Sequence, residues 1–220
     1  TIGGTPRGQF VYSEGQVHVG RGAVVDVAGS AGVQASILEN IITLQLRGAE
    51  FSDFSYNRNG DLRGLDITLD IRRQGVFDGR TWLGTPVADA SGFAGLIQRD
   101  VSQLTIDGGS VNIRSGGSVI MQQGSVLDVS GGYIDYQGAN VTTSRVMIGG
   151  RLVDIANALP DRFYDGLYTG SFTRVSNAWG VADTYTSQLM SGSRYEGGYY
   201  YGGSGGSLNI QAPSMALDAD

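Results

Sequence analysis

The amino-acid sequence predicts an all-β fold of the parallel β-helix (β-solenoid) type, with insertions outside the regular coils. Three observations predict it: 36 glycines among 220 residues, a charged fraction of only 16%, and short alternating segments that recur along the chain. Glycine at this density suits frequent tight turns and would destabilise a helical bundle at nearly every turn. The hydrophobic content of 40% is sufficient for a core.

The clearest repeat covers residues 109–132, with the sequence GSVNIRSGGSVIMQQGSVLDVSGG. It holds three alternating segments about eight residues apart, and each begins with Gly-Ser-Val. Residues of one parity share a face of a strand, so we expect one apolar set to face inward: Val111, Ile113, Val119, Met121 and Val126, with Val129 nearby. The three segments fit the three sides of one triangular coil of roughly 22 residues.

Two other stretches resemble this unit. Residues 15–29 align with residues 117–131 without a gap. Residues 206–218 repeat the GSVNI of residues 109–113 and, with one extra residue, the step Leu127-Asp128 as Leu217-Asp218. The chain therefore contains three copies of one repeating unit.

Two longer insertions separate the copies, and we expect residues 1–220 to form a single β-helix segment of a longer protein. The first insertion, at approximately 33–107, contains alternating strands around residues 42–46 and 65–71 and a short helix near 91–98, with Ser91 as its cap. The second, at approximately 150–205, holds ten of the twenty aromatic residues. Its end, EGGYYYGGSGG, predicts a mobile loop or a hairpin.

Composition argues against several classes of function. The net charge is −6, lysine is absent, and no basic patch larger than the pair Arg72-Arg73 occurs, so we expect no nucleic-acid partner. The absence of cysteine excludes disulfides and thiolate metal sites. No GGxGxD calcium motif and no phosphate loop occurs, so we expect neither metal nor cofactor. No stretch approaches 18 consecutive apolar residues, and we expect a chain that is not embedded in a membrane.

Catalytic groups are sparse, and we predict that the chain is not an enzyme. The single histidine, His18, lies between Val17 and Val19 and is expected to face solvent. A recurring residue such as the pair Asp26 and Asp128 is more typical of a turn than of a catalytic carboxylate. A polysaccharide-active enzyme on a β-helix stays open as an alternative, and its candidate acids are Asp26, Asp66, Asp70, Asp107, Asp128 and Asp135.

The aromatic insertion is the best candidate for recognition, because exposed Tyr and Trp rings stack on sugars and populate interfaces. For most of these rings we expect packing against the flank of the solenoid rather than recognition, with Tyr199, Tyr200 and Tyr201 as the exception. The candidate ligand contacts are Trp179, Tyr195, Tyr199, Tyr200 and Tyr201. The last three are flanked by glycines, which favours an exposed segment. Exposed rings of this kind could stack on sugars, so a polysaccharide-binding module is a second possible function.

The chain resembles the filamentous haemagglutinin family of large bacterial exoproteins. The resemblance is carried by GSVIMQQGSVLDVSGGYIDY (117–136), RVMIGGRLVDIANALPDRFYDGLYTG (145–170), TWLGTPVADASGF (81–93) and GSLNIQAPSMALD (206–218). Two features of the family are missing, namely the NPNG-type motif of the secretion domain and an Arg-Gly-Asp tripeptide. The missing motifs favour a shaft segment over an export signal.

This resemblance implies a right-handed β-helix that forms a shaft of a secreted adhesin. It also implies two-partner secretion through an outer-membrane transporter, a location outside the cell or on the bacterial cell surface, and a role in cell adhesion, aggregation or biofilm formation. The implied partners are flanking coils of the same polypeptide, the transporter, host or matrix glycans, and neighbouring shafts. It implies no catalytic residues.

Overall fold

The computed structural model describes residues 15–47, 56–168, 170–176, 181–186 and 192–219. Strands make up 46% of the structure and helices 9%, which confirms the prediction of an all-β class. The chain divides into two compact units. Unit 1 comprises residues 1–34, 99–135 and 200–220, and unit 2 comprises residues 35–98 and 136–199. No helix among the described residues is both long and apolar enough to cross a membrane.

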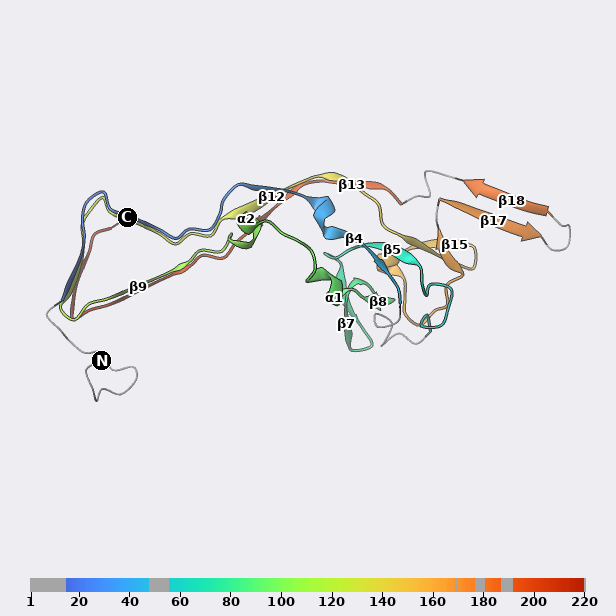
Figure 1. Ribbon diagram of the computed structural model, residues 1–220, viewed down its shortest axis with the longest axis horizontal. Helices are drawn as coiled ribbons and strands as arrows, with labels where there is room; N and C mark the ends of the chain where they lie inside the picture. The colour runs from blue at the N-terminus through green and yellow to red at the C-terminus, as the bar shows by residue number, and fades with distance from the viewer. Residues whose placement is uncertain (1–14, 48–55, 169, 177–180, 187–191, 220) are drawn as a thin grey trace. The chain divides into compact units, whose positions relative to one another are not determined.

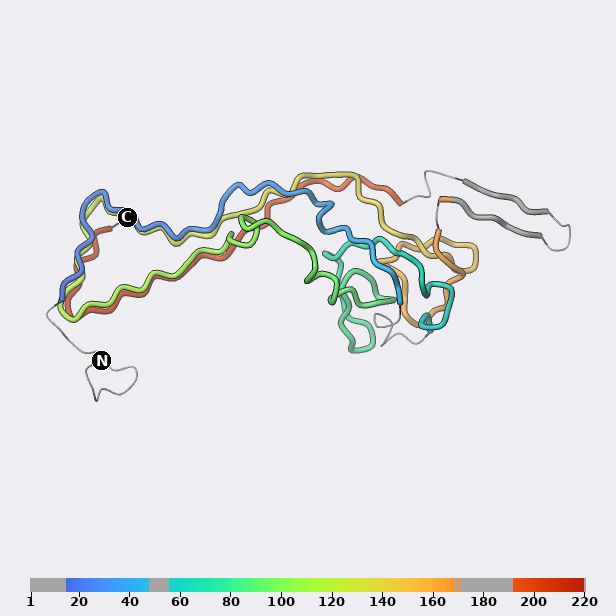
Figure 2. Tube along the Cα trace, in the orientation of Figure 1, coloured from blue at the N-terminus to red at the C-terminus, as the bar shows by residue number. Residues whose placement is uncertain are grey.

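Unit 1 is built from parallel strands contributed by three distant segments of the chain (Figures 1 and 2). Its strands are β1 (Gln16–Val19), β2 (Val24–Asp26), β9 (Ser110–Arg114), β10 (Ser118–Met121), β11 (Val126–Asp128), β21 (Ser207–Gln211) and β22 (Ser214–Leu217), and its helix is α2 (Val101–Leu104). Three further strands form a sheet in the order β20-β12-β3: β3 (Val33–Ser36), β12 (Tyr133–Gln137) and β20 (Tyr199–Gly202).

The repeat alignment corresponds to the spatial register of these strands. β1 pairs with β10 through Gln16 opposite Ser118, and β2 pairs with β11 through Asp26 opposite Asp128, which is the offset of the ungapped alignment. β21 pairs with β9 through Ser207 opposite Ser110, as the GSVNI match predicts. The match of Leu217-Asp218 to Leu127-Asp128 is wrong, because Leu217 lies opposite Met121 on β10.

The predicted set of inward-facing residues is correct for strand β10 and wrong for strand β11. Val119 and Met121 on β10 are buried. On β11 the parity is reversed: Val126 is exposed, whereas Ser125 is buried. The Ser125 hydroxyl donates to the Gln122 carbonyl oxygen over 2.7 Å, so the turn before β11 turns a polar residue inward and shifts the alternation by one.

Glycine has a second role in unit 1 besides its role in turns. A β-carbon on Gly132 would overlap the carbonyl group of Ser30, and one on Gly206 would overlap that of Gly109. These glycines allow backbones to approach one another more closely than any side chain permits. Gly22 and Gly124, with φ of 78° and 84°, represent the expected turn positions.

In the part of unit 2 that the structure describes, the elements are antiparallel strand pairs, two short 3₁₀ helices and one α-helical turn. Its elements are η1 (Ile37–Asn40), β4 (Ile41–Gln45), β5 (Asp66–Asp70), β6 (Gln74–Phe77), β7 (Arg80–Thr85), β8 (Ala88–Asp89), α1 (Ser91–Ala94), β13 (Ala139–Val141), β14 (Arg145–Ile148), β15 (Arg151–Asp154), η2 (Ile155–Asn157), β16 (Gly166–Tyr168), β17 (Ser171–Ser176), β18 (Val181–Thr186) and β19 (Arg194–Glu196).

The core of unit 2 is formed by buried apolar side chains from β4, β5, β8, β14 and η2 and from the segments next to them. The two predicted strands of the first insertion form β4 and β5, with Leu44 opposite Ile67, and both side chains are buried. Thr85 is fully buried and donates its hydroxyl to the Ile155 carbonyl oxygen over 2.6 Å, which joins β7 to η2.

The predicted helix near residues 91–98 is present but shorter, and its predicted cap is wrong. α1 covers Ser91–Ala94, and Ser91 is its first residue rather than its cap. The cap position is held by Ala90, which has no side-chain acceptor, and the Ser91 N–H and hydroxyl both donate to Asp89.

Candidate functional site

A chain of ion pairs crosses the surface of unit 2 between β5, β15 and β19. Arg72, just after β5, makes a bidentate contact with Asp70, and its Nη2 also donates to Glu196. On the other side of Glu196, Arg194 contacts the same carboxylate at 2.8 Å. The guanidinium groups of Arg72 and Arg194 therefore both contact the Glu196 carboxylate, which links the two arginines.

The chain of ion pairs continues from Arg194 to Asp154 on β15, at 3.6 Å. Asp154 also accepts from the Thr143 hydroxyl at 2.8 Å and from the Ala156 backbone N–H at 2.9 Å. The side chain of Asp70 is only 2% exposed. The hydrogen bonds that Arg72 donates to Asp70 raise the pKa of its guanidinium, although burial lowers it, so this cation stays charged at every physiological pH.

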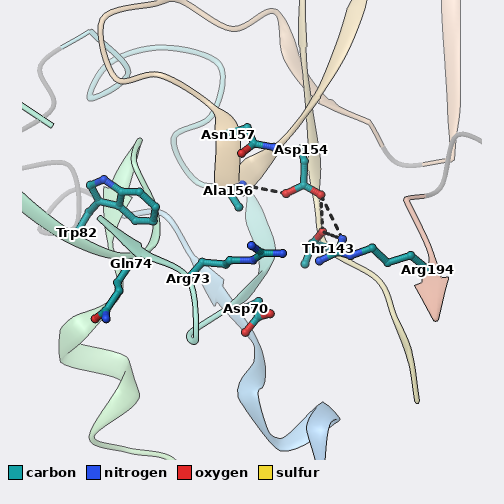
Figure 3. A pocket seen from close by; sticks show the side chains of 9 residues that line it. All are labelled: Asp70, Arg73, Gln74, Trp82, Thr143, Asp154, Ala156, Asn157 and Arg194. Carbon is teal, nitrogen blue, oxygen red and sulfur yellow. Dashed lines mark hydrogen bonds and ion pairs between the residues drawn. The ribbon is translucent and has the colours of Figure 1, made fainter. Parts of the chain in front are cut away.

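Beside the ion pairs lies a hollow of about 460 Å³ within unit 2 (Figure 3). Its lining residues come from the segment β5 to β7, the connection between β13 and β14, β15, η2 and β19: Asp70, Arg73, Gln74, Trp82, Thr143, Asp154, Ala156, Asn157 and Arg194. Figure 3 shows the Arg73 side chain extending into the middle of this group, with Asp70, Thr143 and Asp154 around its guanidinium. The volume lies within the range of about 300–1,000 Å³ that small-ligand sites occupy.

A second hollow of about 400 Å³ adjoins the first and shares Asp70 and Arg73 with it. It is lined in addition by Arg72, Glu196 and Tyr199. The Arg72 guanidinium carbon lies 5.9 Å from the centre of the Tyr199 ring, within the range of a cation–π contact. Tyr199 is in turn stacked on Tyr136, with ring centres 4.9 Å apart, and burial raises the pKa of its phenol.

The candidate ligand contacts from the sequence are not gathered into one site. Tyr199, Tyr200 and Tyr201 belong to strand β20, so the prediction of a mobile loop or hairpin is wrong. Backbone pairing of β20 with β12 orders this stretch despite its glycines. Of these residues, Tyr199 lines the second of the two hollows described above, and Trp179 lies outside the described residues.

The other candidate rings are largely exposed. Tyr200 is 72% exposed and meets Tyr133 edge to face at 5.6 Å within unit 1. Tyr195 is also exposed, and its hydroxyl would stand 2.6 Å from a β-carbon on Gly138. Two other aromatic residues of the second insertion, Tyr164 and Tyr168, are buried in unit 2, and their hydroxyls donate to backbone carbonyl groups.

The two recurring carboxylates of unit 1 accept hydrogen bonds from backbone N–H groups two residues further along the chain. Asp26 accepts from the Ala28 N–H and Asp128 from the Ser130 N–H, over 2.9 and 2.8 Å, which confirms the turn role inferred from their recurrence. Hydrogen bonds from Ser130, led by that of its side chain, lower the pKa of Asp128.

The remaining candidate acids of unit 1 also have local partners. Asp107 accepts from the Ser204 N–H and Asp135 from the Gln34 amide. His18 is exposed, as expected. Within the described ranges, no three His, Cys, Asp or Glu side chains are grouped closely enough to hold a metal ion.

Sequence reasoning missed most of the residues that line the larger hollow. It identified Asp70 as a candidate acid and treated Arg72-Arg73 as only a pair of charges, but Trp82, Asp154 and Arg194 were not singled out. A local signal was present, because Asp70 and Arg72, like Arg194 and Glu196, are oppositely charged residues two positions apart at strand ends. The meeting of these pairs depends on contacts more than 100 residues apart, such as that between Arg72 and Glu196.

No family model, no curated protein and no solved structure matches this chain.

Proposed function

We propose that this chain is a structural and adhesive shaft segment of a large secreted bacterial protein, with unit 1 as stacked coils of a right-handed β-solenoid. The observation that carries the proposal is the parallel, in-register pairing of three distant segments in the ladder β1-β10-β22. Parallel strands lie about 4.8 Å apart, so each added coil lengthens such a stack by that distance. In this proposal the two long insertions supply most of unit 2.

Burial along the ladder supports stacking with further coils. Val119, in the middle strand, is fully buried between Val17 and Met215, whereas Met215 on the outer strand is 47% exposed. Leu208 and Leu217 are similarly exposed, at 45% and 49%. A further coil placed on β21 and β22 would cover these apolar side chains and pair the free edges of both strands.

Adhesion on the cell surface follows from the resemblance to filamentous haemagglutinins, and it is testable directly. The chain would be fused behind the secretion domain of a two-partner system in a bacterium that carries the matching transporter. We expect the fusion at the cell surface, together with increased aggregation or adhesion to epithelial cells, relative to the same fusion without residues 15–219. Retention in the periplasm, or surface display with no gain in aggregation or adhesion, would overturn the proposal.

A polysaccharide-active enzyme is the alternative, and the turn roles of Asp26 and Asp128 weigh against it. The release of new reducing ends from a panel of purified polysaccharides would favour this alternative. A polysaccharide-binding role is compatible with the shaft, because a repeated stack displays binding surfaces at fixed intervals.

A further inference from the structure

The larger hollow of unit 2 combines unused hydrogen-bond donors with an aromatic ring. Among the described residues, Arg73, Gln74, Trp82 and Asn157 have no side-chain hydrogen bond or ion pair, although all four line the hollow. The Arg73 guanidinium alone offers five N–H donors. A ligand with several acceptor oxygens would therefore find donors that the protein itself does not use.

The carboxylates of the hollow are, by contrast, already engaged. Both oxygens of Asp70 accept hydrogen bonds from Arg72. One oxygen of Asp154 accepts from the Ala156 N–H and the other from the Thr143 hydroxyl. These acids have little capacity left to bind a cation or the hydroxyl groups of a neutral ligand. Arg73 is the charged group that remains, and guanidinium groups bind carboxylates through two parallel hydrogen bonds.

Trp82 gives the hollow an apolar wall. It lies opposite Gly75 in the β6–β7 pair, and a β-carbon on Gly75 would come within 2.8 Å of the indole Cε2 atom. The ring thus covers the glycine of the neighbouring strand, and it also lines the hollow. A flat, partly apolar ligand such as a sugar ring matches an aromatic wall beside polar groups.

We propose that this hollow binds a carboxylate-bearing sugar, with Arg73 on the carboxylate and Trp82 against the sugar ring. A long polyanion such as a nucleic acid fits poorly, because three carboxylates lie among the arginines and no basic patch extends beyond them. The inference deepens the proposed adhesive function by naming a class of ligand. The two can fail separately, because a solution titration tests the hollow alone and the export and adhesion experiment tests the shaft.

The test is a calorimetric titration of the whole chain with oligogalacturonate and with the same oligosaccharide after complete methyl esterification. The ester keeps the sugar rings and removes the negative charge. We expect the acid to bind at least tenfold more tightly than the ester. Equal binding of the two, or no binding of the acid at millimolar concentration, would overturn the proposal.

Variants then locate the site. Arg73→Ala should weaken binding of the acid at least tenfold, and Arg73→Lys should restore part of it, because lysine keeps the charge without the paired geometry. Trp82→Ala should weaken binding of the acid as well, because it removes the ring. Gly75→Ala should do the same, because its methyl group displaces the Trp82 indole. Arg151→Ala removes an exposed arginine of β15 that does not line the hollow and serves as the charge-matched control.

Unchanged far-UV circular dichroism would show that each variant is folded. Equal losses in Arg73→Ala and Arg151→Ala would indicate non-specific attraction and overturn the assignment. Binding of peptides with a free carboxyl terminus, but of no acidic sugar, would overturn the ligand class.

Discussion

Gly29 and Gly132 lie so close together in unit 1 that a β-carbon on Gly132 would stand 2.6 Å from the Gly29 carbonyl oxygen. The same β-carbon would overlap the carbonyl group of Ser30, and both obstacles are backbone rather than flexible side chain. Hydrogen bonds bind this region together, since the Gly132 N–H donates to Ile106 and the Gly29 N–H to Ser130.

The first prediction is that Gly132→Ala lowers the free energy of unfolding of unit 1 by about 2 kcal/mol or more, because the backbone must separate to admit the methyl group. Gly205→Ala is the matched control, since a β-carbon there meets nothing within 4 Å, and we expect a change within about 0.5 kcal/mol. Urea unfolding followed by circular dichroism measures both. Equal stability of the two variants would contradict the close packing.

The sequence predicted the strand repeat well because the repeat is local: the offset between residues 15–29 and 117–131 is also the register of β1 on β10. It failed at Val126, where the buried Ser125 reverses the parity. It failed again at Tyr199–Gly202, because a glycine-rich stretch gives no local sign of the neighbouring strand β12 that orders it.

The hollow could not be predicted for a similar reason. Arg73 and Trp82 are close in sequence, but Asp154 and Arg194 reach the same place only through the pairing of distant strands and ion pairs. Composition and spacing contain no information about which of the 15 arginines have carboxylate partners and which do not. Arg72 has such carboxylate partners, and Arg73, the next residue, has none among the described residues.

The second prediction concerns the middle of the β1-β10-β22 ladder. Val119 is fully buried, and Val119→Ala should cost about 1–3 kcal/mol through lost apolar burial and an unfilled cavity. Val24→Ala removes the same two methyl groups from a side chain that is 65% exposed, so its cost should stay within about 0.5 kcal/mol. Thermal unfolding of both variants decides whether β10 is the interior strand; comparable losses would place Val119 outside the core.

The third prediction separates two adjacent arginines. Arg72→Met should destabilise unit 2 by about 2–3 kcal/mol, because Asp70 is buried and would lose its guanidinium partner. Arg73→Met should leave stability within about 0.5 kcal/mol, since Arg73 makes no ion pair among the described residues. Denaturant unfolding at neutral pH gives both values. A larger loss in Arg73→Met than in Arg72→Met would refute the assigned ion pairs.

The fourth prediction is a pH dependence. Hydrogen bonds from Ser130 hold the pKa of Asp128 below its ordinary value of 3.8 in the folded chain. The folded state therefore releases this proton more readily than the unfolded state does. The resulting stability is present at neutral pH, begins to fall near pH 4, and is lost as the pH drops through the lower, folded-state pKa.

Asp128→Asn should remove that part of the pH dependence, because the amide oxygen still accepts from the Ser130 N–H but does not titrate. Stability curves of both proteins between pH 6 and pH 2 should differ in slope only below about pH 4. Parallel curves over the whole range would show that Asp128 titrates alike in the folded and unfolded chain.

The fifth prediction tests the register of β1 on β10. The chain has no cysteine of its own, so only the introduced thiols can form a disulfide. Gln16 and Ser118 are opposite each other on β1 and β10, and the Gln16 amide donates to the Ser118 hydroxyl over 2.9 Å. Neighbouring strands hold opposed α-carbons within the span of a disulfide, about 4.4–6.8 Å. The double variant Gln16→Cys with Ser118→Cys should therefore form an intramolecular disulfide under mild oxidation, detected by mass spectrometry of tryptic peptides.

The mismatched pair His18→Cys with Ser118→Cys is the control for that experiment. It uses a residue on the same face of β1 but two positions out of register, so its α-carbons are too far apart for a disulfide without movement of the backbone. We expect the matched pair to form a disulfide at least tenfold faster than the mismatched pair. Equal rates would mean that β1 slides along β10, and the stacking on which the shaft proposal rests would then have no fixed register.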